Sequence, residues 1–165
     1  MDILDQLKTP FAPKEIHWRI GRKSKKGDTA TALAYLDARN VMKRLDGVLG
    51  VSGWQDKYKV EPPRTVRKYC KKLNAYYNEQ ICGRVICELS IKVGDEWITK
   101  CDGAGETNVE GEKGAISDAF KRAAVKFGVG RYLYYLDSFY YPIDNYGNFT
   151  SAPNLPKWAL PKELK

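Results

Sequence analysis

The sequence has one histidine and four cysteines among its 165 residues, too few for the common metal sites. The cysteines stand at Cys70, Cys82, Cys87 and Cys101. None forms the Cys-x-x-Cys pair that zinc sites normally use. We therefore expect no metal and four reduced cysteines, several of them packed in strands. We interpret His17 as structural because no nucleophile motif accompanies it.

Long apolar runs are also missing. No stretch approaches the roughly 18 apolar residues of a membrane-spanning helix. The opening segment MDILDQLKTPF lacks the basic and apolar regions of a secretory signal. We therefore expect a cytoplasmic protein that has no membrane partner.

Catalytic motifs are scarce. The glycines near residues 103–114 do not form the GxxxxGK[ST] phosphate loop. One acidic group keeps a metal-dependent nuclease as an alternative, and it consists of Asp95, Glu96, Asp102, Glu106, Glu110 and Glu112. Turn formation and a favourable helix dipole also explain these acids. We predict that the chain is not an enzyme and has no catalytic residue or cofactor.

Positive charge is what the chain has in excess. Lysine and arginine number 28 against 20 acidic residues, for a net charge of +8. Such a field attracts polyanions, so nucleic acid is the leading partner class. The basic residues gather in three places, which are Lys14–Lys26, Arg64–Lys72, and the group Lys121, Arg122, Lys126 and Arg131. No base-reading motif is present, so we expect contacts to phosphates.

Helical periodicity predicts two main helices. The first runs over Ala38–Leu49, with Asp37 as its cap and Gly50 as its end. The second runs from about Asn108 to Phe127. Thr107 and Glu110 have the spacing of a capping box at its start. We also expect a turn from Pro13 through Trp18.

Alternating patterns predict strands over Thr29–Leu36, Trp54–Val60, Arg84–Val93 and Glu96–Cys101. Gly21–Asp28 contains no apolar residue and is interpreted as an exposed basic loop. A basic, aromatic hairpin is expected between the second and third of these strands. We expect residues 137–165, rich in proline and tyrosine, to form a tail packed on the surface.

Three segments resemble, in order and spacing, the annealing domain of Rad52-type recombination proteins and the similar Sak-type phage annealing proteins. They are YLDARNVMKRLDGVLGVSGW, RVICELSIKVGDEWITKCDGAGE and EKGAISDAFKRAAVKFG. The resemblance covers roughly Ile16–Leu136. It implies an α+β fold in which a curved antiparallel β-β-β sheet is packed by a long helix, and assembly into an oligomeric ring. The whole chain would be one annealing domain with its core at about 16–136.

The resemblance also implies DNA-binding residues. Lys121 and Arg122 match phosphate-gripping residues of the family, and Arg19 matches another. Tyr35 resembles a groove-lining tyrosine. Lys113 is a weaker match, and Lys126 stands near the position of an arginine that Val125 replaces. The insertion with Arg64, Arg67 and Lys68 is longer and more basic than the family hairpin, which suggests a second strand-binding surface or an inter-subunit contact.

The expected function is ATP-independent single-stranded DNA binding and annealing of complementary strands in recombination and repair. The absence of the eukaryotic members' tail favours a phage protein in the host-cell cytoplasm. Expected partners are single-stranded DNA, further copies in a ring, and a phage or host recombination or single-strand-binding protein. The alternatives are a protective binder that does not anneal, the nuclease, and an assembly protein whose charge is incidental.

Overall fold

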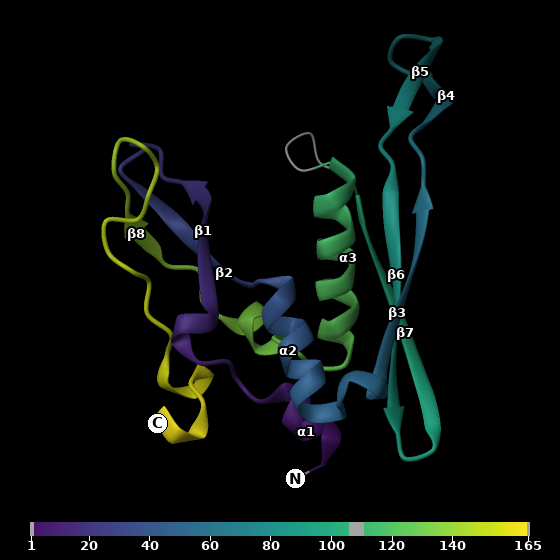
Figure 1. Ribbon diagram of the computed structural model, residues 1–165. Helices are drawn as coiled ribbons and strands as arrows, with labels where there is room; N and C mark the ends of the chain where they lie inside the picture. The colour runs from purple at the N-terminus through teal and green to yellow at the C-terminus, as the bar shows by residue number, and fades with distance from the viewer. Residues whose placement is uncertain (1, 106–110, 165) are drawn as a thin grey trace. The chain divides into compact units, whose positions relative to one another are not determined.

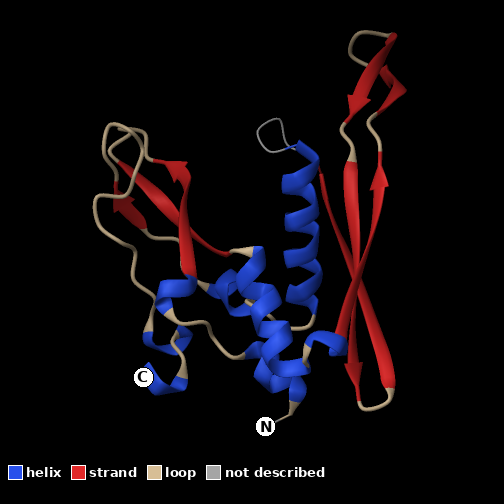
Figure 2. Cartoon of the chain, viewed as in Figure 1, coloured by secondary structure: helices blue, strands red, loops and turns tan. Residues whose placement is uncertain are grey.

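The computed structural model describes residues 2–105 and 111–164, apart from the side chains of residues 111–113 and 164. The chain forms two compact units, residues 1–50 with 125–165 and residues 51–124. Each unit combines antiparallel strands with helical segments (Figures 1 and 2). This confirms the predicted α+β class, while the ring and the single annealing domain remain predictions.

The second unit contains a three-stranded antiparallel sheet in the order β3-β6-β7. Its strands are β3 (Trp54–Glu61), β6 (Arg84–Val93) and β7 (Glu96–Gly105). The three strands predicted here are confirmed, although β3 and β7 extend further than expected. One face of β6 is fully buried and consists of Val85, Cys87, Leu89 and Ile91. The period of two therefore fixes which side of the sheet meets the core.

Helix α3 (Gly111–Lys126) belongs with this sheet face. Its buried side chains are small apart from Phe120, and the Phe120 ring centroid lies 5.9 Å from that of Trp54 on β3. The predicted helix is thus confirmed over its described part and ends one residue earlier than expected. Its predicted start, with Thr107 and Glu110, lies outside the described residues.

The first unit has a sheet of order β1-β2-β8, formed by β1 (Ile16–Lys23), β2 (Thr29–Leu36) and β8 (Tyr140–Pro142). Helix α1 (Ile3–Lys8) and helix α2 (Ala38–Leu49) pack in the same unit. The bounds of α2 match the prediction. The Asp37 carboxylate accepts a hydrogen bond from the Arg39 N–H at 2.7 Å, and Gly50 ends the helix with φ 74°.

Strand β1 corrects two predictions. The helical turn begun by Pro13 ends at Glu15 instead of continuing through Trp18. The expected basic loop over Gly21–Asp28 is also partly wrong, because the strand continues to Lys23. The physical reason is that exposed His17 and Arg19 alternate with more buried apolar neighbours, which is strand periodicity.

Short segments complete the first unit. They are the 3-10 turns Pro13–Glu15, Arg131–Tyr135, Lys157–Ala159 and Lys162–Leu164. Strand β8 pairs with β2, and Ala159 is fully buried. The unit's buried apolar side chains are Leu7, Phe11, Ile16, Ala30, Leu36, Val41, Leu45, Phe127, Val129 and Ala159. The last 29 residues thus contribute both a strand and a core side chain.

A two-stranded hairpin completes the second unit. It consists of β4 (Arg64–Cys70) and β5 (Ala75–Ile81), which pair with each other in a two-stranded sheet. Pro62 and Pro63 separate β4 from β3, and proline has no N–H to donate to a ladder. A short 3-10 turn, Val51–Gly53, precedes β3. The predicted hairpin is therefore confirmed as an extension of the sheet (Figure 1).

Candidate nucleic-acid interface

Helix α3 separates a buried face from a charged one. Asp118, Arg122 and Lys126 are exposed and follow one another at intervals of four residues, so they lie along one side of the helix. Lys121 is half-buried beside them. Because the opposite side is packed with alanine and phenylalanine, the fold fixes the direction in which these charges point.

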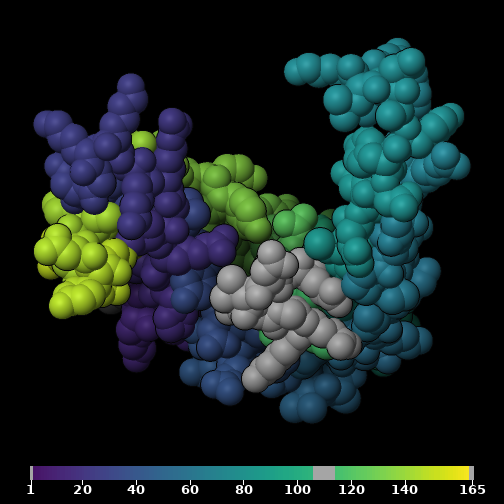
Figure 3. Space-filling view, turned by 90° about the horizontal axis from the view of Figure 1, so that it is seen from above, coloured from purple at the N-terminus to yellow at the C-terminus, as the bar shows by residue number. Residues whose placement is uncertain are grey.

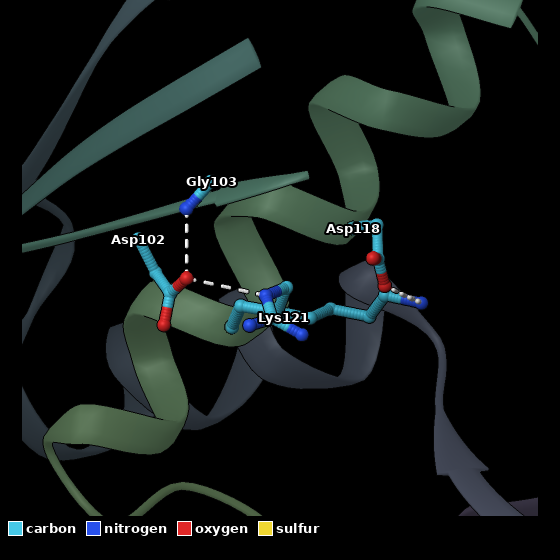
Figure 4. A network of polar contacts seen from close by, with 5 residues as sticks. Asp102, Gly103, Asp118 and Lys121 are labelled. Carbon is cyan, nitrogen blue, oxygen red and sulfur yellow. Dashed lines mark hydrogen bonds and ion pairs between the residues drawn. The ribbon is translucent and has the colours of Figure 1, made fainter. Parts of the chain in front are cut away.

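Two cations of α3, Lys121 and Arg122, lie beside carboxylates (Figure 4). Arg122 Nε lies 3.2 Å from Asp102 Oδ1 of β7, and the same oxygen accepts the Gly103 N–H at 2.8 Å. Lys121 Nζ lies 3.9 Å from Asp118 Oδ1. The Arg122 side chain is nevertheless 47% exposed. Its guanidinium carries five N–H donors, so an ion pair through Nε leaves the terminal nitrogens to address a phosphate.

The end of α3 uses a further arginine differently. Arg131 donates from Nε to the Val125 carbonyl at 2.9 Å and from a terminal nitrogen to the Lys126 carbonyl at 2.6 Å. These are the carbonyls that a helix end leaves without intrahelical partners. Arg131, which belongs to the third basic segment, therefore caps the helix, whereas the neighbouring Lys126 side chain is exposed.

The sheet of the first unit brings Arg19 and Tyr35 together. Arg19 is paired with Leu33, and Tyr35 with His17, so all four side chains share one exposed face. The His17 and Tyr35 ring centroids are 5.4 Å apart. Sequence reasoning missed His17 as part of this surface, and its alternation with Arg19 was the signal for it. The face offers a cation beside two aromatic rings.

The predicted residues fall into separate groups. Arg19, Tyr35 and Lys126 belong to the first unit, and Lys121 and Arg122 belong to the second. One groove containing all of them remains a prediction. The Lys113 side chain lies outside the described residues.

The hairpin holds the other three predicted residues, which are Arg64, Arg67 and Lys68. Lys68 forms an ion pair with Glu79. The Arg67 guanidinium lies 4.5 Å from the centre of the Tyr76 ring. All three predicted residues are exposed.

The members of the acidic group that the structure describes do not gather as a metal site. In the described ranges 2–105 and 111–164, no three His, Cys, Asp or Glu side chains could hold an ion. Asp102 faces Arg122, and Asp95 and Glu96 are exposed at the turn between β6 and β7. Glu106, Glu110 and the Glu112 side chain lie outside the described residues.

A small polar group lies on the sheet face that carries Cys87. The Tyr58 hydroxyl donates to Asp56 Oδ2 at 2.6 Å. Burial, supported by nearby Asp56, raises the pKa of Cys87 to about 12, and burial raises the pKa of Tyr58 as well. A nucleophilic cysteine needs a lowered pKa. Cys87 therefore contributes to the packing of the core and does not act as a nucleophile. All four cysteines are reduced, as predicted.

None of the helices within residues 2–105 and 111–164 combines the length and the apolar character that crossing a membrane requires.

Comparisons with known proteins agree on one family. The model of the Rad52/22 family of double-strand break repair proteins matches residues 1–146. The single-stranded DNA-binding protein DdrA of Deinococcus deserti is 34% identical over 161 residues, which cover 97% of this chain and 71% of the relative. DdrA of Deinococcus radiodurans is 29% identical over 163 residues, covering 97% of this chain and 68% of the relative. Both relatives are named for DNA binding and not for a reaction, which agrees with the expectation that the chain is not an enzyme.

Proposed function

We propose that this chain, which belongs to the Rad52/22 family of double-strand break repair proteins, binds single-stranded DNA by its phosphates and anneals complementary strands. Two relatives carry the name of single-stranded DNA-binding proteins. The name of these relatives refers to binding, and the annealing of strands is an additional part of this proposal. The proposed annealing needs neither a nucleotide nor a metal.

The observation that carries the proposal is the adjacent pair Lys121 and Arg122 on the charged side of α3. The other side of the helix is core, so the backbone that holds the two cations is fixed. Lysine and arginine gain affinity by releasing the counterions condensed on DNA phosphates. Contacts of this kind carry no sequence information, which is what an annealing protein requires.

Annealing follows from holding a strand by its backbone. A strand held extended does not fold on itself, and its bases are ordered before the partner arrives, which lowers the entropic cost of pairing. Neutralised phosphates reduce the repulsion of a second strand. Pairing is then downhill without ATP, because each stacked base-pair step contributes on the order of 1.4 kcal/mol.

Further residues extend the proposed surface beyond α3. Arg19 and Tyr35 supply a cation and a ring on the first unit's sheet, and Lys126 extends the charged side of α3. Lys113, Arg64, Arg67 and Lys68 complete the set of proposed DNA contacts. A ring of identical subunits would repeat this set along one strand. Phage origin and a recombination partner protein belong to the same proposal.

The experiment that tests the proposal measures binding of labelled single-stranded and duplex oligonucleotides in EDTA over a range of salt concentrations. We expect tight, sequence-independent, salt-sensitive binding with preference for single strands. Absence of salt-sensitive binding would refute the proposal and favour an assembly protein with incidental charge. Cleavage that EDTA abolishes would indicate the nuclease. Binding without faster strand pairing would identify a protective binder.

A further inference from the structure

The β4–β5 hairpin has no core of its own. None of the residues from Arg64 to Ile81 is buried, and most are exposed. Its large apolar side chains are open to solvent, with exposures of 47% for Tyr69, 73% for Leu73, 62% for Tyr76 and 46% for Tyr77. An isolated two-stranded hairpin is only marginally stable in water. Exposed rings on such an element call for an explanation other than packing.

The pairing register divides the hairpin into two faces. Tyr69 is paired with Tyr76, and Arg67 with Asn78. Side chains of directly paired residues, and of residues two positions apart, point to the same side. Arg67, Tyr69 and Tyr76 therefore share one side, which we call the tyrosine face. Tyr77 and Lys68 lie on the opposite side.

Contacts on the tyrosine face form a continuous series. The Arg67 guanidinium lies 4.5 Å from the Tyr76 ring centre. The Tyr76 ring lies 5.1 Å from that of Tyr69, with an interplanar angle of 58°. The Tyr69 hydroxyl in turn donates to Asn74 Oδ1. Tyr76 is thus oriented by its neighbours while 62% of it stays exposed, so a flat ligand finds a ring that is already ordered.

The opposite face differs in its electrostatics. On that face Lys68 forms an ion pair with Glu79, which neutralises the charge of this one cation. Over residues 64–81 the hairpin carries five cations, which are Arg64, Arg67, Lys68, Lys71 and Lys72, against the single acid Glu79. This net charge favours a polyanion. Figure 3 shows the hairpin's side chains projecting from the unit that carries it.

These features together select the chemistry of a ligand. A polyanion alone would need cations but no exposed rings, and an apolar partner would need rings but no net charge. Unpaired nucleic acid has both phosphates and flat aromatic bases with free faces, and base-on-aromatic stacking is how single strands are commonly held. Duplex DNA hides the faces of its bases inside the stack.

We infer that the tyrosine face is a base-stacking site, in which Tyr76 and Tyr69 stack against unpaired bases while Arg67 and the turn lysines Lys71 and Lys72 attract the phosphates. This inference rests on the proposed function, since it concerns the same single-stranded ligand. It adds a base contact to a surface that otherwise contacts the backbone alone.

The test compares two adjacent tyrosines on opposite faces, Tyr76→Ala and Tyr77→Ala. Each is titrated against labelled oligodeoxythymidylate and against an oligomer of the same length made of abasic sites, which keeps the phosphates and lacks bases. We expect Tyr76→Ala to weaken binding of the thymidylate by about fivefold or more. The abasic oligomer should bind as it does to the wild type, and Tyr77→Ala and Tyr76→Phe should leave both affinities unchanged.

Equal losses for the two oligomers, or equal effects of Tyr76→Ala and Tyr77→Ala, would overturn the inference. Sedimentation without DNA is the second measurement. A change of oligomeric state in Tyr76→Ala would show that the face binds another copy of the chain and would also overturn it. The hairpin lies outside the buried core, so these variants should fold.

Lys121→Ala/Arg122→Ala in the same titrations separates the two claims. Normal DNA binding by that variant contradicts the proposed phosphate contacts of α3. Normal binding by Tyr76→Ala contradicts only the stacking site.

Discussion

Arg122 on α3 and Asp102 on β7 form an ion pair, with Nε 3.2 Å from Oδ1. The pair joins the residue proposed to grip phosphate to a carboxylate that competes with phosphate for it. Asp102 also accepts the Gly103 N–H, so the carboxylate is held in place. A phosphate at the terminal nitrogens of Arg122 would therefore meet the repulsion of this nearby carboxylate.

Asp102→Asn should strengthen single-stranded DNA binding. The amide keeps the shape and an acceptor for Gly103, but it removes the negative charge that competes with phosphate at Arg122. Ion pairs with this degree of exposure contribute about 0.2–1 kcal/mol, so we expect affinity to rise by up to about fivefold. Fluorescence anisotropy of a labelled oligonucleotide measures this affinity. Glu88→Gln, on the other face of the same sheet, is the matched control, and weaker binding by Asp102→Asn would contradict competition.

Lys121→Ala/Arg122→Ala should abolish most single-stranded DNA binding and leave the fold intact, because these charges lie away from the core. A plot of log K against log salt has a negative slope, and each lost phosphate contact makes it shallower by about 0.7 for single strands. The slope of the double variant should therefore be shallower than that of the wild type by about 1.4. Titration at several salt concentrations measures the slope.

The control for this double variant is Lys57→Ala/Lys92→Ala, which removes the same charge from exposed positions on the sheet face opposite Cys87. It should retain the wild-type slope. An equal loss in both variants would mean that total charge, rather than the α3 pair, determines affinity.

Gly130→Ala should destabilise the protein more than Gly94→Ala. Both glycines have positive φ, 67° and 61°, and a left-handed conformation costs an ordinary residue roughly 1–2 kcal/mol. An added Cβ at Gly130 would lie 2.5 Å from Cδ1 of the buried Leu36, whereas nothing lies within 4 Å at Gly94. Displacing packed atoms costs a further ~1–3 kcal/mol. Urea denaturation should show this difference, and equal losses would contradict the close contact.

Stability should fall in alkali. In the unfolded chain Cys87 loses its proton near its ordinary pKa of 9.0, whereas the folded protein retains it until a pKa of about 12. Between these values the unfolded state binds fewer protons, so the free energy of unfolding decreases as pH rises. The raised pKa of Tyr58 acts in the same direction. Well below pH 9 both groups are protonated in the folded and the unfolded state, so their titration does not change stability there.

Urea midpoints between about pH 8 and about pH 10.5 test this linkage. Cys87→Ala/Tyr58→Phe should show a shallower decline with pH than the wild type, whatever its stability at neutral pH. Parallel declines would exclude these two groups as the cause.

Local signals explain what the sequence predicted well. Helix α2 has a capping aspartate at one end and a glycine at the other, so its bounds required no tertiary information. Strand β6 alternates over ten residues, and the hairpin carries turn residues between two strand-like runs. In each case neighbours along the chain determine the structure.

Long-range pairing explains what the sequence did not predict. Strand β8 has only three residues and exists because β2 offers it an edge. Strand β1 was hidden by Pro13 on one side and a run of charges on the other. The Asp102–Arg122 pair joins residues 20 apart, and the contact between the Tyr76 and Tyr69 rings depends on hairpin register. Composition indicated basic and aromatic residues there, but only the register shows which share a face.

The rate at which two labelled complementary oligonucleotides pair, with and without the protein, in EDTA and without nucleotide, tests the central claim most directly. We predict strong acceleration by the wild type and little by Lys121→Ala/Arg122→Ala. Tight binding without acceleration would contradict annealing.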